Sequence, residues 1–552
     1  MAKDSHSVLK QNALLTQLLN LSPSQASTPT PLVHISDQVP AGRGLVFICP
    51  VEAQQVLLTL PADTLINVKS FKSFFRPELL PLQASVTRGG EGRSDEGRLS
   101  SALLLTLLLA RAHVETELGR GRSKATTKDD VLRLFVQTLP GTFDSVPLTW
   151  SLVASRLKEE REGKTSWKGD FFASLLQALP PHSRNLQQKV RHRFESDWST
   201  FLSLRDSNCD VLTEPSLLTS DPALARDIIH AIEKPLFLWA WHCVNSRCVF
   251  LPLGLARHGD NFTLAPMLDM ANHTSDPARE CKVGYLPDGG LQMYAPDVPQ
   301  GRSPSVTKEG DECFITYGAH SNESLLSEYG FVLPRDLSPD QQWQGSRYVD
   351  VLVDPEVEDL LNRQGEEGEE KIELLQNRGY WGEFTLHPYP EPHPSHRLVP
   401  ALRLAALNLR ATPAEGSAPK VAKTKANAGV KAGRKVHPVD GRGGASDLDK
   451  WEETLTGYRD TVSEENERKA HELLIQLCES RRKKNGGARR HLAEARVTLE
   501  SHTDEADAGI RTRLEPDLDG CKLSLAFVEQ LLDEEDAVLR LVGQSAQDGV
   551  EW

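Results

Sequence analysis

The sequence predicts an α+β fold in which helical segments outnumber strands. Short apolar runs at residues 33–35, 45–49 and 56–60 are bounded by glycine or proline, as strands are. Helical patterns dominate residues 99–238, and β-character returns in residues 248–315 before the last third becomes helical again. The β-rich part is therefore divided in the sequence by a long helical insertion.

Length and charge exclude several classes of protein. A chain of 552 residues exceeds one compact core and predicts several domains. Its formal net charge of −14 excludes a bulk basic surface, so we expect no direct nucleic-acid partner. The most apolar run, residues 100–112, is shorter than the ~20 residues that cross a bilayer, so we expect no membrane partner.

Cysteine usage indicates the compartment. The eight cysteines are scattered and include no CxxC pair, so neither a disulfide framework nor a metal site is predicted. The first residues lack the charged and apolar segments of a secretory signal. We therefore expect reduced thiols and a location in the cytoplasm, the nucleus or both.

Changes in pattern divide the chain into five segments. They are an N-terminal helix (1–25), the first part of the β-fold (26–75), a helical insertion (76–235), the second part of the β-fold (236–335) and an all-helical C-terminal domain (340–552). Within the last segment, residues 411–446 are rich in Ala, Gly, Lys and Pro and are predicted to be a disordered linker. Its lysines suit a solvated loop better than a nuclear signal.

Polar side chains interrupt the second β-rich region. Asp269 precedes Asn272 and His273 by three or four residues, so these side chains would share a face if the segment formed a helical turn. A predicted strand delivers Tyr317 to a glycine turn, and Tyr329 follows twelve residues later. Asn272 could bind a polar ligand and Tyr317 could place a hydroxyl in an apolar pocket. By themselves, however, such features more often have a structural role.

Eight fragments occur in an order that resembles SET-domain protein methyltransferases. They are residues 41–45 (AGRGL), 239–241 (WAW), 244–247 (VNSR), 269–273 (DMANH), 310–312 (GDE), 315–318 (ITYG), 321–323 (SNE) and 329–331 (YGF). More narrowly, the chain resembles the class typified by the Rubisco large-subunit lysine methyltransferase. In that class a helical insertion splits the SET domain, and a helical substrate-binding domain follows it. The resemblance covers about residues 35–335.

The resemblance implies a set of cofactor-binding residues. They are Gly42, Arg43, Gly44, Ser246, Arg247, Asn272, His273 and Tyr329. The glycine turn would lie against S-adenosylmethionine with its backbone, because close approach needs residues without bulk. The segment of Asn272 and His273 would thread beneath a later strand as a pseudoknot, which is an exception to the rule of unknotted chains.

The resemblance also implies the residues of the methyl-transfer point. Tyr317 matches the catalytic tyrosine, while Arg247 and Tyr285 match substrate-binding residues of the lysine channel. Methyl transfer is an in-line displacement that depends on positioning. The attacking lysine must be neutral, and an apolar channel beside a sulfonium lowers its pKa. No carboxylate base is needed, so we interpret Asp269 as structural.

The resemblance therefore implies an S-adenosylmethionine-dependent protein-lysine N-methyltransferase, expected to be a monomer, with non-histone substrates such as ribosomal or translation proteins. A histidine-methylating branch of the class is one alternative. Cys248, Val249 and Leu268 offer no evident hydrogen-bond partner for an imidazole, so lysine is favoured. A catalytically silent interaction module is the other alternative. The presence of Asn272 together with Tyr317 argues against it, since a scaffold would not need the transfer-point hydroxyl.

Overall fold

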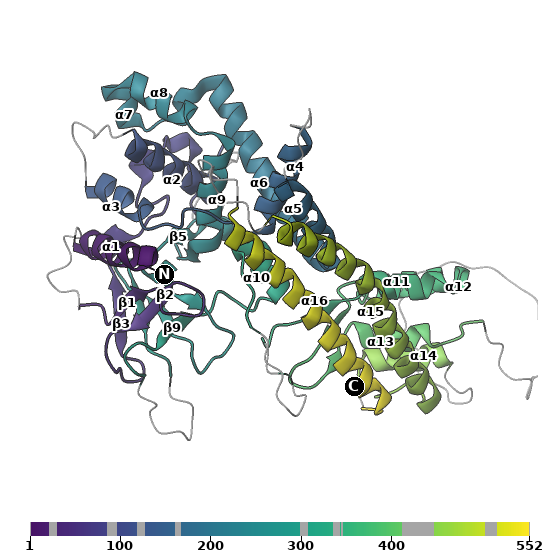
Figure 1. The fold of residues 1–552 in the computed structure, drawn as a ribbon. Coiled ribbons are helices and arrows are strands. Elements are labelled where there is room, and N and C mark those ends of the chain that lie inside the picture. Colours follow the sequence, from purple (N-terminus) through teal and green to yellow (C-terminus); the bar gives the residue numbers. More distant parts are fainter. Residues whose placement is uncertain are drawn as a thin grey trace, which may run out of the picture. The chain divides into compact units, whose positions relative to one another are not determined.

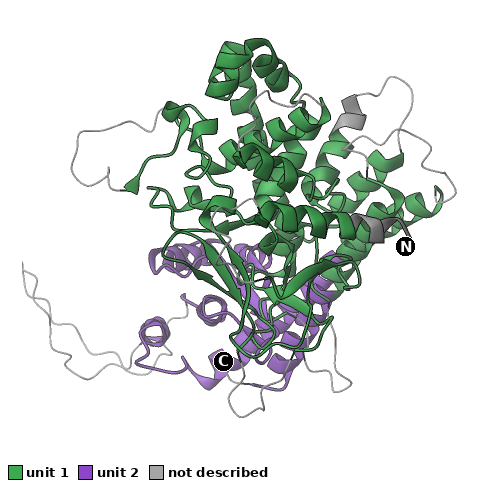
Figure 2. Cartoon of the chain, turned by 90° about the vertical axis from the view of Figure 1, so that its left-hand side faces the viewer, with its two compact units in different colours: residues 1–349, 487–533 green, residues 350–486, 534–552 purple. Residues whose placement is uncertain are grey.

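The computed structural model describes residues 2–20, 30–84, 97–118, 127–159, 167–297, 307–334, 343, 346–410, 446–502, 516–550 and 552 (Figure 1). Helices make up 57% of the structure and strands 11%, so the predicted α+β class is confirmed. The chain forms two compact units, residues 1–349 with 487–533 and residues 350–486 with 534–552 (Figure 2). The five segment boundaries expected from the sequence stay predictions.

The first unit contains a four-stranded sheet built from distant parts of the chain. In spatial order its strands are β1 (Val33–Ser36), β2 (Gly44–Phe47), β9 (Glu312–Ile315) and β6 (Asn272–His273). The first three strands pair antiparallel, whereas β6 runs parallel to β9. This parallel pairing is what the predicted pseudoknot requires, since it brings the Asn-His segment alongside the strand that precedes Tyr317.

Two further β-elements complete the strands of the first unit. A three-stranded antiparallel sheet has the order β3 (Val56–Leu60), β8 (Leu291–Tyr294) and β7 (Lys282–Tyr285). A two-stranded pair joins β4 (Cys248–Phe250) to β5 (Phe262–Leu264). Strands from both sides of the insertion thus meet in one fold, as the divided β-pattern of the sequence predicted.

Helices of the first unit lie before, within and after the β-rich regions (Figure 1). They are α1 (Ala2–Asn20), α2 (Ser101–Glu117), α3 (Thr127–Val136), α4 (Pro147–Glu159), α5 (Trp167–Ala178), α6 (Pro181–Asn208), α7 (Pro215–Ser220), α8 (Pro222–His230), α9 (Lys234–Arg247) and α10 (Asn322–Tyr329), together with parts of α15 (Glu464–Glu500) and α16 (Leu518–Gln547). Ser100 caps α2 by accepting from the backbone N–H of Leu103. No helix in the described ranges is both long and apolar enough to cross a membrane.

One hydrophobic core joins the sheets to the insertion. Leu45 and Phe47 of β2 are buried with Leu58 of β3. The same cluster includes Leu104 of α2 and Phe237 of α9. Because α9 ends at the edge of this core, its last residues lie beside the strands that carry the candidate site.

The second unit is largely helical but contains a small sheet. Its elements are β10 (Val351–Leu352), α11 (Asp354–Asn362), α12 (Glu366–Asn377), β11 (Thr385–His387), β12 (His393–Pro394), α13 (Leu398–Ala405) and α14 (Asp447–Leu455), with parts of α15 (Glu464–Glu500) and α16 (Leu518–Gln547). The sequence predicted the helices and missed these strands, which are too short to show an alternating pattern. The predicted disordered linker lies, but for Ser446, outside the described residues.

Candidate active site

The candidate site lies where β2, β6 and β9 meet the ends of α9 and α10. The turn before β2 supplies the glycines, β6 supplies Asn272 and His273, and the turn after β9 supplies Tyr317. Helix α10 lies beside both α6 and α9 and ends at Tyr329 (Figure 1). Most of the residues that the resemblance singled out are therefore close together.

Asn272 links the glycine turn to β9. Its Nδ2 donates to the backbone oxygen of Arg43 at 2.9 Å and to Oε1 of Glu312 at 2.7 Å. A Cβ on Gly44 would lie 2.6 Å from Nδ2 of Asn272 and 2.7 Å from Oε1 of Glu312. Gly42 adopts a positive φ of 82°, where L side chains are strained. The backbone conformation thus favours glycine at position 42, and the contacts of Asn272 require glycine at position 44.

His273 fixes the backbone that carries the candidate catalytic tyrosine. The backbone N–H of Tyr317 donates to Nδ1 of His273 at 3.1 Å, and the two rings stack with centroids 5.1 Å apart. Burial lowers the pKa of His273 to about 4, so the imidazole is neutral at neutral pH, and Nδ1 is its unprotonated nitrogen because it accepts this bond. The parallel pairing of β6 with β9 places the two residues in register for it.

The Tyr317 hydroxyl lies in a cluster of rings. It donates to the backbone oxygen of Ala271 at 2.8 Å. The Tyr317 ring centroid is 5.1 Å from that of Tyr329 and 6.1 Å from that of Phe331. Burial raises the pKa of Tyr317 above its ordinary value, although Arg247 acts in the opposite direction. The hydroxyl is therefore neutral at physiological pH and can act as a hydrogen-bond donor.

Asp269 forms hydrogen bonds with Arg247 and interacts through its charge with Arg43. Nη1 of Arg247 donates to the backbone oxygen of Asp269 at 2.9 Å and to its Oδ2 at 3.1 Å, and the carboxylate is fully buried. Burial and the nearby charge of Arg247 lower the pKa of Arg43 to about 10, while Asp269 opposes this decrease. Burial raises the pKa of Asp269, whereas the charges of Arg247 and Arg43 act in the opposite direction. Because Arg247 binds both the backbone and the side-chain oxygen of Asp269, we interpret Asp269 as structural.

Asp269 and Asn272 do not share a helical face, because the helical turn on which that expectation depended ends before Asn272. The helical turn spans only Leu268–Met270, and the chain is extended from Ala271 onward. Asp269 consequently contacts Arg247, whereas Asn272 contacts the glycine turn.

The hydroxyls of Ser246 and Tyr285, two residues that the resemblance implied, are bound to backbone oxygens outside the ring cluster. The Ser246 hydroxyl donates to the backbone oxygen of His242 at 2.7 Å, within its own helix. Tyr285 is 53% exposed, and its hydroxyl donates to the backbone oxygen of Phe250 at 3.2 Å. The structure thus places Tyr285 against β4, whereas the rings packed on Tyr317 belong to other residues.

Sequence reasoning missed His320 and Asn245. Nε2 of His320 lies 3.2 Å from the backbone oxygen of Tyr317, and its ring centroid lies 6.1 Å from that of Tyr329. Nδ2 of Asn245 donates to the backbone oxygen of Glu328 at 3.1 Å. Asn245 directly precedes the Ser-Arg pair, so its position in that motif was the signal available in the sequence.

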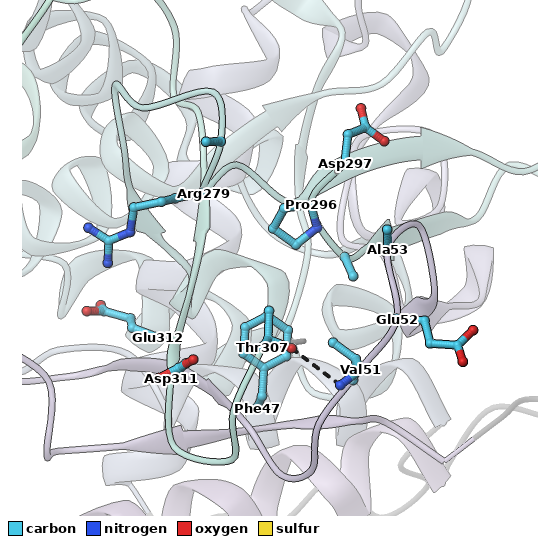
Figure 3. A pocket seen from close by; sticks show the side chains of 12 residues that line it. Phe47, Val51, Glu52, Ala53, Arg279, Pro296, Asp297, Thr307, Asp311 and Glu312 are labelled. Atoms are coloured by element: carbon cyan, nitrogen blue, oxygen red, sulfur yellow. Dashed lines mark hydrogen bonds between the residues drawn. The ribbon is translucent and has the colours of Figure 1, made fainter. Parts of the chain in front are cut away.

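A pocket of about 350 Å³ lies at the other end of β2 and β9 (Figure 3). Phe47, Arg279, Thr307 and Glu312 are among the side chains that line it, and Thr307 accepts from the backbone N–H of Val51 at 3.3 Å. Glu312, which accepts from Asn272, also lines this pocket. The rings of Tyr317, Tyr329 and Phe331 do not line it. In the described part of the chain, no group of three or more His, Cys, Asp or Glu residues could hold a metal ion.

Comparison with known proteins places these features in context. No family model matches the chain. It is 32% identical over 193 residues to SET domain-containing protein 4 of Mus musculus, covering 34% of this chain and 39% of that protein. It is 27% identical over 259 residues to Ribosomal lysine N-methyltransferase 2 of Saccharomyces cerevisiae, covering 45% of this chain and 49% of that protein. The chain thus matches about half, or less, of the length of these curated relatives.

The chain is also similar to solved structures. The crystal structure of the SET domain of LSMT bound to lysine and AdoHcy has a TM-score of 0.47 and 18% sequence identity, over 98% of this chain and 91% of that chain. The names of the curated relatives confirm the resemblance to SET-domain lysine methyltransferases that the eight fragments indicated.

Proposed function

We propose that this chain is an S-adenosylmethionine-dependent protein-lysine N-methyltransferase with a non-histone protein substrate. The observation that carries the proposal is the Tyr317 hydroxyl, which is held by Ala271 at the end of β9 beside the Asn272 and glycine-turn contacts. Curated relatives named as SET-domain proteins and ribosomal lysine methyltransferases support it. The name of the Saccharomyces cerevisiae relative, Ribosomal lysine N-methyltransferase 2, makes a ribosomal protein the first substrate to test.

The residues present fit S-adenosylmethionine. Apart from Gly42 and its two chain neighbours, no atom of the described residues lies within 4 Å of a Cβ built on Gly42, so the glycine turn leaves room for a ligand against its backbone. Nε of Arg247 and Oδ1 of Asp269 are buried and have no hydrogen-bond partner among the described residues, so both atoms could still bind a polar group of a ligand. The cofactor would be held by the turn of Gly42 and Gly44 together with Asn272. When bound, it supplies a methyl group on a positively charged sulfonium.

The hydrogen bond of Tyr317 indicates how the substrate amine would be oriented. Because the hydroxyl proton is directed to Ala271, the lone pairs of the tyrosine oxygen remain free to accept from an amine N–H. The attacking nitrogen must itself be unprotonated. Burial against the rings around Tyr317 would lower the lysine pKa, so the proton would be lost to water before the transfer.

Lysine suits the site better than histidine. Cys248 and Val249 lie on β4, paired with β5, and Leu268 is buried. Burial raises the pKa of the Cys248 thiol, so it remains neutral and is a weak hydrogen-bond partner for an imidazole. A monomeric state, the absence of a nucleic-acid partner and a location in cytoplasm or nucleus stay predictions.

The proposal is tested by labelled methyl transfer to two acceptors, unmethylated ribosomal proteins and core histones. We expect label in the ribosomal fraction with the wild type and a loss of about a hundredfold with Tyr317→Phe, because the amine would lose the acceptor that orients it and misplacing a reacting group costs about that much. Label in histones alone would reassign the substrate. Cofactor binding by calorimetry without any transfer would favour a catalytically silent interaction module.

A further inference from the structure

A hydrogen-bond network surrounds the peptide that precedes Tyr329. Nδ2 of Asn245, near the end of α9, donates to the backbone oxygen of Glu328 at 3.1 Å and to its Oε2 at 2.9 Å. That carbonyl belongs to the peptide bond between Glu328 and Tyr329. It lies in the last turn of α10, where backbone oxygens lack partners within the helix. One side chain of α9 therefore fixes the peptide plane at the end of α10.

The carboxylate of Glu328 is oriented by a second partner. Nη2 of Arg193 on α6 lies 2.7 Å from Oε1 of Glu328, and the Arg193 guanidinium lies over the Trp241 ring at 5.7 Å from its centroid. The side chains of Glu328 and Arg193 are 33% and 50% exposed. This ion pair is partly solvated, so we expect the Asn245 bonds to contribute more to the position of the peptide.

The chain is also fixed on the other side of Tyr329. Gly330 has a φ of 81°, and a Cβ there would lie 2.7 Å from Cγ2 of Val146. The Ser145 hydroxyl donates to the backbone oxygen of Gly330 at 2.6 Å. The Tyr329 hydroxyl, in contrast, makes no hydrogen bond within the described part of the chain. The position of the Tyr329 ring thus depends on its backbone anchors and on its packing against Tyr317.

We propose that Asn245 is a positioning residue for methyl transfer, which fixes the Glu328–Tyr329 peptide and thereby the placement of the Tyr329 ring beside Tyr317. This inference rests on the proposed function and deepens it. Asn245 lies two residues before Arg247 in α9, and its hydrogen bonds to Glu328 join the end of α9 to the end of α10. The room around the substrate amine depends on these rings, so the network also affects how many methyl groups one lysine receives.

The test compares Asn245→Asp with Asn185→Asp, the same substitution at an exposed position of α6. In the first variant a carboxylate oxygen replaces the donor and faces the oxygens of Glu328. We expect kcat to fall about tenfold or more, because small displacements at a reacting centre are costly, with the cofactor Kd unchanged. The ratio of mono-, di- and trimethyl-lysine would shift. Asn185→Asp would change none of these quantities, and Arg193→Gln would have a smaller effect than Asn245→Asp.

A second measurement does not depend on activity. The protein is labelled with 3-fluorotyrosine, and Tyr329→Phe and Tyr317→Phe assign the two fluorine resonances. The inference predicts that Asn245→Asp shifts or broadens the Tyr329 resonance, whereas Asn185→Asp does not. If the wild type methylates no lysine, the proposed function fails while the resonance still decides the placement of Tyr329. An unchanged Tyr329 resonance, or an unchanged kcat in an active enzyme, would overturn the inference.

Discussion

Replacing Asp269 by asparagine keeps the shape of the side chain and removes its charge. The carboxylate is fully buried, its Oδ2 lies 3.1 Å from Nη1 of Arg247, and it also opposes the decrease in the pKa of Arg43. With a pKa of about 10, Arg43 stays protonated at neutral pH. Asp269→Asn would therefore leave two partly buried guanidinium charges without their carboxylate.

The size of this effect follows from the burial. Breaking a buried ion pair by removing one partner costs about 3–5 kcal/mol. The first unit has about 400 residues. For a unit of that size the entropy of unfolding is about 0.8 kcal/mol/K, so the melting temperature would fall by about 4–6 °C.

The assay is differential scanning calorimetry of Asp269→Asn beside Asp206→Asn. Asp206 forms an ion pair with Arg205 at 2.9 Å, but its side chain is 65% exposed, so the control should change the free energy of unfolding by less than about 1 kcal/mol. If both variants melt within a degree of each other, the idea that the buried carboxylate of Asp269 compensates the charges of Arg43 and Arg247 is refuted.

Three further predictions concern the site and its surroundings. Gly44→Ala would force a Cβ against Asn272 and weaken cofactor binding by at least about tenfold in calorimetry; an unchanged Kd would contradict the close approach. Burial lowers the pKa of His242 to about 3, so the folded state binds fewer protons than the unfolded state between pH 3 and 6.5, and stability falls as the pH decreases through this window. His242→Gln should reduce that decrease in melting temperature, and an identical acid profile would argue against it. Tyr285→Phe should change kcat/KM far less than Tyr317→Phe, because Tyr285 is 53% exposed; equal losses would restore Tyr285 to the lysine channel.

Sequence patterns predicted the longer elements and missed the shortest. The run that became β3 (Val56–Leu60) is apolar and ends at Pro61, so its bounds could be read from the sequence. Strands β10 and β12 have two residues each, and no periodicity exists at that length. Their formation depends on pairing with β11, which is a tertiary effect.

The order of the motifs predicted which residues would gather, but not how they would contact one another. Asn272 and Arg43 were both expected near the cofactor, yet their hydrogen bond joins residues 229 positions apart. The bond between Asn245 and Glu328 spans 83 positions and had no separate sequence signal. Tyr285 is the opposite case. Its place in the order of motifs predicted a position in the lysine channel, but its hydroxyl binds the backbone oxygen of Phe250 on β4, away from the rings around Tyr317.

The central claim is that Tyr317 directs methyl transfer to a lysine. The most direct measurement is to incubate the wild type and Tyr317→Phe with labelled S-adenosylmethionine and unmethylated ribosomal proteins, and to hydrolyse the products to single amino acids. We predict label in methyl-lysine that is lost in the variant. Label in methyl-histidine, or methyl-lysine formed equally well by the variant, would contradict it.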